Sequence, residues 1–272
     1  MTYTHQDLLK TAILSAWKAG KAIMEIYDTE FSFEWKDDKS PLTEADLRSH
    51  NVIKAALELT GYPVLSEEGK TIPYADRNNW EMFWLVDPLD GTKEFIKRNG
   101  EFTVNIAFIN KGIPELGVIY VPVTKKLYFG LKEAGSFTFD AGEDVEQNLV
   151  EYISGGSRLP ASTLRSEYTI VSSRTHSSPE TEAFISQKSS QHGNVNLINA
   201  GSSLKLCLVA EGKADVYPRL APTMEWDTAA GDAIVRCAGG RVYDYETKQD
   251  LRYNKENLLN PFFVAEIANN NE

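Results

Sequence analysis

The sequence has few cysteines and no long apolar run. Its two cysteines, Cys207 and Cys237, each lie in an apolar helical pattern, so we expect buried, inert thiols in a reducing compartment and no disulfide framework. No apolar run approaches the roughly 18 residues that a membrane-spanning helix needs. The first residues lack the basic and apolar regions of a signal peptide. These absences favour a cytoplasmic protein without a transmembrane segment.

Positive charge is also scarce. The chain has 28 lysines and arginines against 39 aspartates and glutamates, and its formal net charge is -11. Because an acidic chain repels polyanions, this charge argues against a nucleic-acid polymer as partner. It is still compatible with a small phosphorylated molecule, provided that metal ions neutralise that molecule locally.

The apolar patterns predict a mixed protein of helices and sheets. At 272 residues the chain makes one large domain or two closely packed halves. Helical spacing predicts helices over 6–27 and 43–59, and alternation between 102 and 139 predicts an antiparallel meander. The polar, loop-like stretch 140–166 is the predicted boundary between an N-terminal half, 1–150, and a C-terminal half, 151–272.

The strongest chemical signal follows a short apolar run at 82–86. That run predicts a buried strand, which ends abruptly in charge at Asp87. Pro88 makes the next turn rigid, and Gly91 permits a positive φ and a close approach of the backbone to a ligand. The residues from 92 to 96 then predict the first turn of a short helix.

This turn brings together groups that suit a metal and a phosphate. The carboxylates of Asp87 and Asp90 and the carbonyl of Leu89 form an all-oxygen donor set, which suits Mg²⁺ better than zinc. Free N–H groups at the helix start, at Gly91 and Thr92, suit a phosphate. The alternative is a tight turn with acids on the surface, and the segment alone leaves both interpretations open.

Three other acidic positions are ambiguous when each is taken alone. Asp46 follows Thr43 with the spacing of a helix capping box, Glu67 lies in an acidic turn after a short apolar strand, and Asp227 lies near a helix start. Glu67 and Asp227, like Asp87 and Asp90, lie where an apolar element ends or a helix begins, beside glycine or other small residues. Separated segments of this kind can build one metal cluster.

Cationic and hydroxyl side chains recur in the second half. Ser202 and Lys205 begin an apolar helix that either binds an anion or is simply capped by serine. Arg219 follows a strand, and its guanidinium can grip a phosphate with two hydrogen bonds. His176 lies in a polar loop, where a solvated histidine is the commoner case.

Taken together, the motifs resemble those of the inositol monophosphatase superfamily of metal-dependent, lithium-sensitive phosphatases. The matching segments are Leu-Ser-Glu-Glu-Gly at 65–69, Asp-Pro-Leu-Asp-Gly-Thr at 87–92 and Trp-Asp-Thr-Ala-Ala-Gly at 226–231. Segments 93–95, 99–105, 201–205 and 217–219 resemble its 3'(2'),5'-bisphosphate nucleotidase branch, of the bacterial sulfur-assimilation type. The resemblance covers nearly the whole chain in order, and it implies an α+β fold, a layered α-β-α-β-α sandwich.

The resemblance also implies a mechanism. Two or three Mg²⁺ ions would be held by Glu67, Asp87, Asp90, Asp227 and the Leu89 carbonyl. Two metals can clamp an in-line displacement and lower the pKa of a bound water. Asp46, Glu67 and Thr92 would orient that water as it attacks phosphorus.

The implied reaction removes the 3'-phosphate of adenosine 3',5'-bisphosphate and gives AMP and phosphate. PAPS is a second candidate substrate, with APS as its product. The implied substrate contacts are Leu89, Asp90, Gly91, Thr92 and Asp227 around the scissile phosphate, Ser202, Lys205 and Arg219 around the second phosphate, and His176 on the nucleotide.

Other functions are weighed against this one. An inositol or sugar-phosphate phosphatase of the same superfamily need not hold a second phosphate, so Lys205 and Arg219 argue against it. A haloacid-dehalogenase-type phosphatase spaces its two aspartates by one residue, whereas two residues separate Asp87 from Asp90. A Mg²⁺-responsive binding module would not need the water-orienting set. The sequence leaves open a monomer or a homodimer, and peripheral association with the inner membrane.

Overall fold

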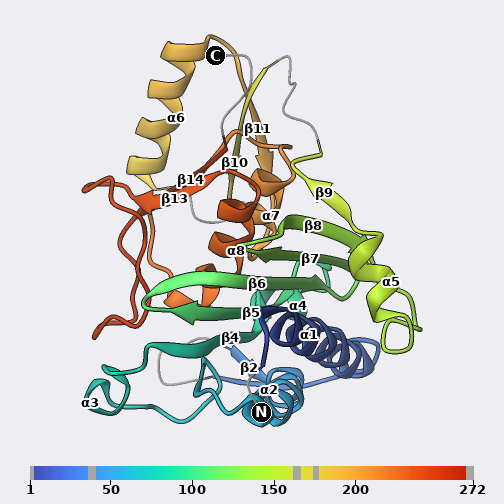
Figure 1. Ribbon diagram of the computed structural model, residues 1–272. Helices are drawn as coiled ribbons and strands as arrows, with labels where there is room; N and C mark the ends of the chain where they lie inside the picture. The colour runs from blue at the N-terminus through green and yellow to red at the C-terminus, as the bar shows by residue number, and fades with distance from the viewer. Residues whose placement is uncertain (1–2, 36–40, 162–166, 174–177, 268–272) are drawn as a thin grey trace.

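The computed structural model describes residues 3–35, 41–161, 167–173 and 178–267 (Figure 1). His176 lies outside these residues, so its predicted contact with a nucleotide stays a prediction.

A seven-stranded sheet forms the larger of two main sheets. Its order is β3-β4-β5-β6-β7-β8-β9, with β3 and β4 parallel and the other pairs antiparallel. The strands are β3 (Val64–Ser66), β4 (Met82–Asp90), β5 (Thr103–Asn110), β6 (Ile113–Val121), β7 (Lys126–Leu131), β8 (Gly135–Asp140) and β9 (Ser157–Leu159). The predicted antiparallel meander is therefore confirmed.

Alternation along these strands gives the sheet two buried faces. Trp84 and Val86 of β4 pack into the core under helices α1 (His5–Tyr27) and α2 (Glu44–Leu57), whereas Phe83 and Leu85 face the opposite core. Shorter elements surround this half: β1 (Phe33–Trp35), β2 (Pro41–Thr43), the 3-10 helix η1 (Glu58–Thr60), α3 (Tyr74–Arg77), α4 (Thr92–Ile96) and α5 (Leu149–Ser154).

The second sheet completes a five-layer arrangement. Its order is β11-β10-β12-β14-β13. Helices α7 and α8 lie between the two sheets, and α6 packs on the outer face of the second sheet (Figure 1). The elements are β10 (Tyr168–Ser172), α6 (Pro179–His192), β11 (Val195–Asn199), α7 (Leu204–Ala210), β12 (Val216–Arg219), α8 (Glu225–Cys237), β13 (Arg241–Asp244) and β14 (Phe263–Glu266). The predicted α-β-α-β-α layering is confirmed.

Helix α8 lies unusually close to its neighbours because small residues line the contacts. A Cβ added to Gly117 of β6 would lie 2.2 Å from the Ala230 carbonyl oxygen, and one added to Gly231 would lie 2.3 Å from the Leu206 side chain of α7. No side chain fits in either gap. The small residues therefore let the start of α8, and Asp227 with it, lie next to the end of β4.

Two local predictions are wrong. Asp87 does not leave the strand, since β4 continues to Asp90 with an irregularity in its pairing between these two residues. Pro88 has no N–H for the ladder, so a bulge takes the place of a clean strand end. The stretch 140–166 is not merely loop, because it contains α5 and β9. Strand β9 joins the sheet by backbone pairing, which its polar composition does not reveal. The division at residue 150 stays a prediction.

Candidate active site

Asp46 performs two tasks at the start of α2. Its Oδ2 accepts the Thr43 backbone N–H at 2.7 Å and the Thr43 hydroxyl at 2.5 Å, so the predicted capping box is present. Its Oδ1 accepts the hydroxyl of Thr92, at the start of α4, at 3.1 Å. The buried carboxylate thus connects α2 to the turn that follows β4.

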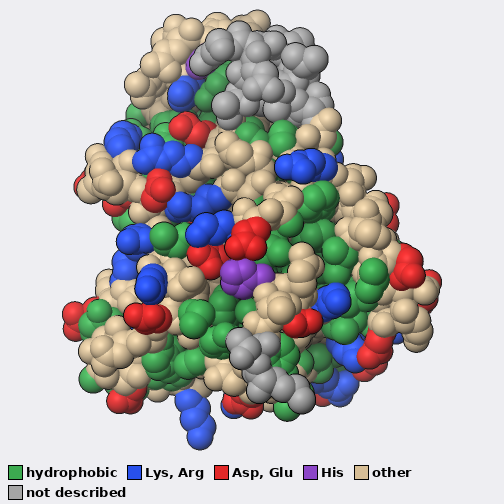
Figure 2. All heavy atoms as spheres, viewed as in Figure 1, with side chains coloured by type: hydrophobic (Ala, Val, Ile, Leu, Met, Phe, Trp, Pro, Cys, Tyr) green, Lys and Arg blue, Asp and Glu red, His purple; other side chains and the backbone are tan. Residues whose placement is uncertain are grey.

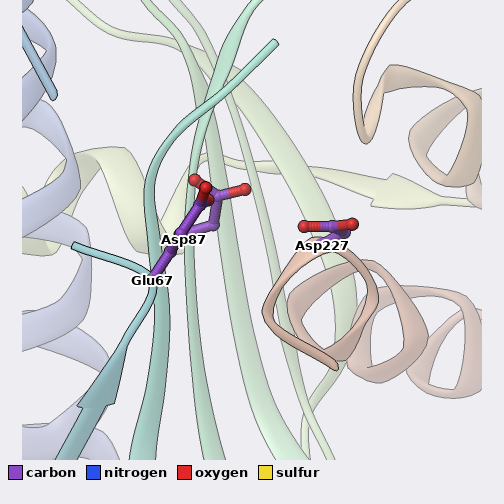
Figure 3. Close-up of side chains that lie close together, drawn as sticks. All are labelled: Glu67, Asp87 and Asp227. Carbon is purple, nitrogen blue, oxygen red and sulfur yellow. The ribbon is translucent and has the colours of Figure 1, made fainter. Parts of the chain in front are cut away.

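Three carboxylates from distant segments converge beside this pair (Figure 3). Glu67 follows β3, Asp87 lies in β4 and Asp227 lies in the first turn of α8; one oxygen of each lies within 4.8 Å of the others. Asp87 Oδ1 also accepts the Leu89 N–H at 3.1 Å. Asp227 is the third residue of α8, and its Oδ2 accepts the N–H of Met224, the N-cap residue, at 2.9 Å.

Burial and like charge make this cluster unfavourable without a cation. Burial, followed by the charges of Glu67, Asp90 and Asp227, raises the pKa of Asp87 well above its ordinary value. Burial, Asp90 and Glu67 raise the pKa of Asp227 in the same way. A set of oxygen donors that repel one another in a low-dielectric site is the donor chemistry that suits a hard divalent cation.

Asp90 lies beside this group and is held by α7. The Ser203 hydroxyl lies 2.7 Å from Asp90 Oδ2 and 2.8 Å from the Asp227 carbonyl oxygen. The Asn105 amide of β5 donates to the Ser203 oxygen at 2.9 Å and reaches Asp90 at 3.4 Å. Ser203 therefore connects Asp90, the last residue of β4, to the start of α8.

The glycine turn after Asp90 needs its positive φ. Gly91 has φ of 93° and is the N-cap of α4. A Cβ there would lie 2.1 Å from the Ser202 hydroxyl oxygen. That hydroxyl contacts the carbonyl oxygens of Asp90 and Glu101 at 2.9 and 2.7 Å. The starts of α4 and α7 therefore touch at the backbone of the glycine.

A pocket of about 150 Å³ opens beside this contact. Lys205 is 6% exposed and donates to the Ser202 carbonyl at 2.6 Å, and burial lowers the pKa of its ammonium to about 8. Arg219 donates one N–H to the Pro222 carbonyl at 2.9 Å, and its buried Nε has no partner in the described part of the chain. The residues that line the pocket include Asp90, Gly91, Ser202, Lys205, Arg219 and Asp227.

The structure thus gathers every described member of the predicted site into one region. On the face seen in Figure 2, lysine and arginine side chains gather beside a group of acidic side chains near the middle of the molecule, although the chain as a whole is acidic. The roles of these residues as ligands and catalytic groups stay predictions.

The sequence reasoning missed the residues that hold the site together. Ser203 and Asn105 lie inside the segments 201–205 and 99–105, but neither was given a role. Ser49 and His50 of α2 were missed as well. Their spacing from Asp46, three and four residues, is a helical signal that places them on the same face of α2.

Comparisons with known proteins agree with this geometry. Residues 4–267 match the model of the inositol monophosphatase family. The chain is 43% identical over 264 residues to the 3'(2'),5'-bisphosphate nucleotidase CysQ of Salmonella typhimurium. This alignment covers 96% of this chain and 100% of that protein.

Solved structures give the same result. The crystal structure of CysQ from Bacteroides thetaiotaomicron, described as a bacterial member of the inositol monophosphatase family, superposes with a TM-score of 0.89 at 53% identity and covers 96% of this chain and 97% of that one. The extragenic suppressor protein suhB from Bartonella henselae has a TM-score of 0.73 at 24% identity, covering 95% and 93%, which is a likeness of fold alone. Among the described helices, none has the length and apolarity needed to cross a bilayer.

Proposed function

The chain belongs to the inositol monophosphatase family, and we infer that it is a 3'(2'),5'-bisphosphate nucleotidase. It hydrolyses the 3'-phosphate of adenosine 3',5'-bisphosphate to AMP and phosphate. The single observation that carries this assignment is that one pocket joins the acidic cluster to two fixed cations. Asp90 and Asp227 line this pocket, and so do Lys205 and Arg219.

The family is metal-dependent, and the acidic cluster fits a divalent cation. The fit rests on three carboxylates within 4.8 Å whose burial and mutual repulsion raise the pKa of Asp87 and Asp227. We assign Mg²⁺, two or three ions, to Glu67, Asp87, Asp90, Asp227 and the Leu89 carbonyl. When bound, Mg²⁺ supplies positive charge for the ester oxygens and lowers the pKa of water.

The remaining chemistry is carried by side chains of the chain itself. The Thr92 hydroxyl donates a hydrogen bond to Asp46, so the lone pairs of the Thr92 oxygen can accept a hydrogen bond from the attacking water. Together with Glu67, this pair orients the water for in-line attack on phosphorus. The new P–O bond forms as the bond between phosphorus and the ribose 3'-oxygen breaks. One proton of the attacking water ends on that oxygen, which becomes the 3'-hydroxyl, and the other stays on the released phosphate. No covalent phosphoenzyme is needed.

The second phosphate supplies selectivity. The scissile phosphate lies at the N–H groups of Gly91 and Thr92, and the 5'-phosphate lies against Ser202, Lys205 and Arg219. A monophosphate cannot fill both positions, so it leaves the cations without a partner. This reasoning separates a bisphosphate nucleotidase from an inositol or sugar-phosphate phosphatase of the same family. PAPS, which also carries a 3'-phosphate, is a second substrate and yields APS.

A phosphate-release panel tests the assignment. Purified protein with Mg²⁺ is given adenosine 3',5'-bisphosphate, PAPS, inositol 1-phosphate and fructose 1,6-bisphosphate, and kcat/KM is measured for each. We expect adenosine 3',5'-bisphosphate to rank first, PAPS to be cleaved, and release to stop when EDTA is added. A higher kcat/KM for inositol 1-phosphate would contradict the assignment and indicate an inositol phosphatase instead.

A further inference from the structure

One face of helix α2 contacts three separate segments of the site. Asp46, Ser49 and His50 are spaced so that their side chains lie next to one another. Asp46 accepts from Thr92, as described above. The Ser49 hydroxyl donates to the Pro88 carbonyl at 2.6 Å, and His50 Nδ1 lies 2.9 Å from the Ser66 hydroxyl. The exposed fractions of Ser49 and His50 are 0% and 9%.

The two turns held by Ser49 and His50 are those that carry proposed metal ligands. Pro88 lies between Asp87 and Leu89. Ser66 immediately precedes Glu67, and its carbonyl closes the turn by accepting the Gly69 N–H at 3.0 Å. The α2 face is thus bonded to the backbone next to Asp87 and to the side chain next to Glu67.

The sheet supplies only part of the restraint on these turns. The Glu67 N–H donates to the Val86 carbonyl of β4 at 3.1 Å, next to Ser66 and Val86, the final register pair of β3 and β4. When both are ionised, Glu67 and Asp87 repel each other and push the two segments apart. Ser49 and His50 hold both turns from the helix side with hydrogen bonds that need no charge on either partner.

Packing alone does not explain these two polar residues. The same face of α2 continues with Ile53 and Leu57, which are buried in the core beneath the sheet and anchor the helix without hydrogen bonds. Burying a hydroxyl or an imidazole costs free energy unless the group forms a hydrogen bond. The specific hydrogen bonds of Ser49 and His50 therefore explain why these polar residues lie here.

We propose that Ser49 and His50 are positioning residues, which set the separation of the Glu67 and Asp87 carboxylates and thereby the affinity of the metal centre. Their role presupposes the metal-dependent phosphatase proposed above. Neither residue touches substrate or the reacting atoms in this scheme.

A pair of matched serine variants separates positioning from ordinary stability. Ser49→Ala removes the bond to Pro88. Ser15→Ala is the control, because Ser15 is also buried, at 1% exposed, and donates only to Thr11 within its own helix at 2.7 Å. Mn²⁺, another cation that favours oxygen ligands, is titrated into the substrate-free full chain and followed by electron paramagnetic resonance. The Mg²⁺ concentration for half-maximal phosphate release is measured in parallel.

Ser49→Ala should bind Mn²⁺ about tenfold more weakly than the unaltered chain and should need about tenfold more Mg²⁺ for half-maximal rate, as is usual when a partner of a ligand is lost. At saturating Mg²⁺ its KM should stay within about twofold. Ser15→Ala should change neither metal quantity. A purely structural role would lower the melting temperature of both variants alike and leave their metal titrations equal.

Two substitutions at His50 give a second, independent test of the positioning role if Ser49→Ala folds poorly. Asn places an amide nitrogen near the position of Nδ1, whereas Leu has no hydrogen-bonding group. His50→Leu should lose Mn²⁺ affinity about tenfold, and His50→Asn should recover most of it. Equal Mn²⁺ affinity in His50→Leu and the unaltered chain, or in Ser49→Ala and Ser15→Ala, overturns the proposal. If the unaltered chain releases no phosphate from the bisphosphate, the proposed function fails instead, and the Mn²⁺ titration still decides the role of Ser49.

Discussion

Replacing Asp87 with Asn should stabilise the protein in the absence of metal and abolish its stabilisation by Mg²⁺. Asp87 is 1% exposed and belongs to the group of three carboxylates whose oxygens lie within 4.8 Å of one another. Without a cation, these acids either repel one another or hold protons. Asn has nearly the same shape and removes the charge, and its Oδ1 can still accept the Leu89 N–H.

The distance gives the size of the effect. At an effective dielectric constant of about 20, two unit charges separated by this distance repel by about 3 kcal/mol. Part of that energy is avoided because the acids protonate, so we expect a gain on the order of 1–3 kcal/mol for Asp87→Asn. For a protein of this size, such a gain raises the melting temperature by about 2–8 °C.

The folding stability of the metal-free chain should depend on pH, and the direction of this dependence follows from the pKa of Asp87. Burial and the neighbouring acids raise the pKa of Asp87 in the folded chain, so the folded state holds its proton to a higher pH than the unfolded state. Stability without metal should therefore fall as pH rises from about 4, the ordinary pKa of an aspartate, through the raised folded pKa of Asp87. The advantage of Asp87→Asn should be absent below pH 4 and largest above the folded pKa.

Thermal unfolding in EDTA and in Mg²⁺, between pH 4 and pH 8, measures both effects. Asp215→Asn is the control, because Asp215 is equally buried and accepts a backbone N–H, from Thr169 at 2.6 Å, but lies outside the cluster. It should gain no stability in EDTA and should keep the Mg²⁺ response. If Asp87→Asn melted lower than the unaltered chain in EDTA at pH 8, repulsion within the cluster would not be what limits stability, and the reasoning would be refuted.

Three further outcomes follow from the same geometry. Asp90→Asn should reduce kcat by at least about 100-fold while circular dichroism stays unchanged, because it weakens a ligand but can keep the bond to Ser203; near-normal turnover in Mg²⁺ would remove Asp90 from the ligand set. Arg219→Ala should lower kcat/KM for adenosine 3',5'-bisphosphate by about 100-fold and for a monophosphate by less than about threefold, since it loses a charged hydrogen bond to the second phosphate only; equal losses would contradict that assignment. Burial lowers the pKa of Lys205 to about 8, so KM for the bisphosphate should rise above pH 8 as the ammonium loses its proton, and Lys205→Arg should flatten this rise; an unchanged pH profile in Lys205→Arg would count against the role of Lys205.

The features predicted best from the sequence are those that depend on residues close together in the chain. The turn at Gly91 between β4 and α4 is encoded locally, because Gly91 takes a φ of 93° that other residues rarely adopt. The capping box of Thr43 and Asp46 is likewise local, and it is present as predicted. The layering of helices and sheets followed from the resemblance of motifs spread along the whole chain.

Contacts between distant segments could not be predicted in this way. Ser203 and Asp90 are 113 residues apart, and their 2.7 Å contact depends on how closely α7 approaches the end of β4. The small residues at 228–231 do predict that α8 packs closely against a neighbour, but they do not identify Leu206 of α7 as what lies against Gly231. The bulge at Pro88 and the pairing of β9 were mispredicted for a similar reason, since both depend on partner strands and not on their own composition.

Because acidic and basic side chains line one pocket, a divalent cation should bind there before a phosphate does. With the acids ionised, Asp90 and Asp227 repel a phosphate that approaches Lys205 and Arg219, because all four side chains line the same pocket. A divalent cation on the acidic side converts that repulsion into attraction. By linkage, a bound bisphosphate must then raise the affinity for the cation by the same factor. A chain with a formal net charge of -11 can bind a polyanionic nucleotide for this reason, because the cation and the two basic side chains attract it at this pocket.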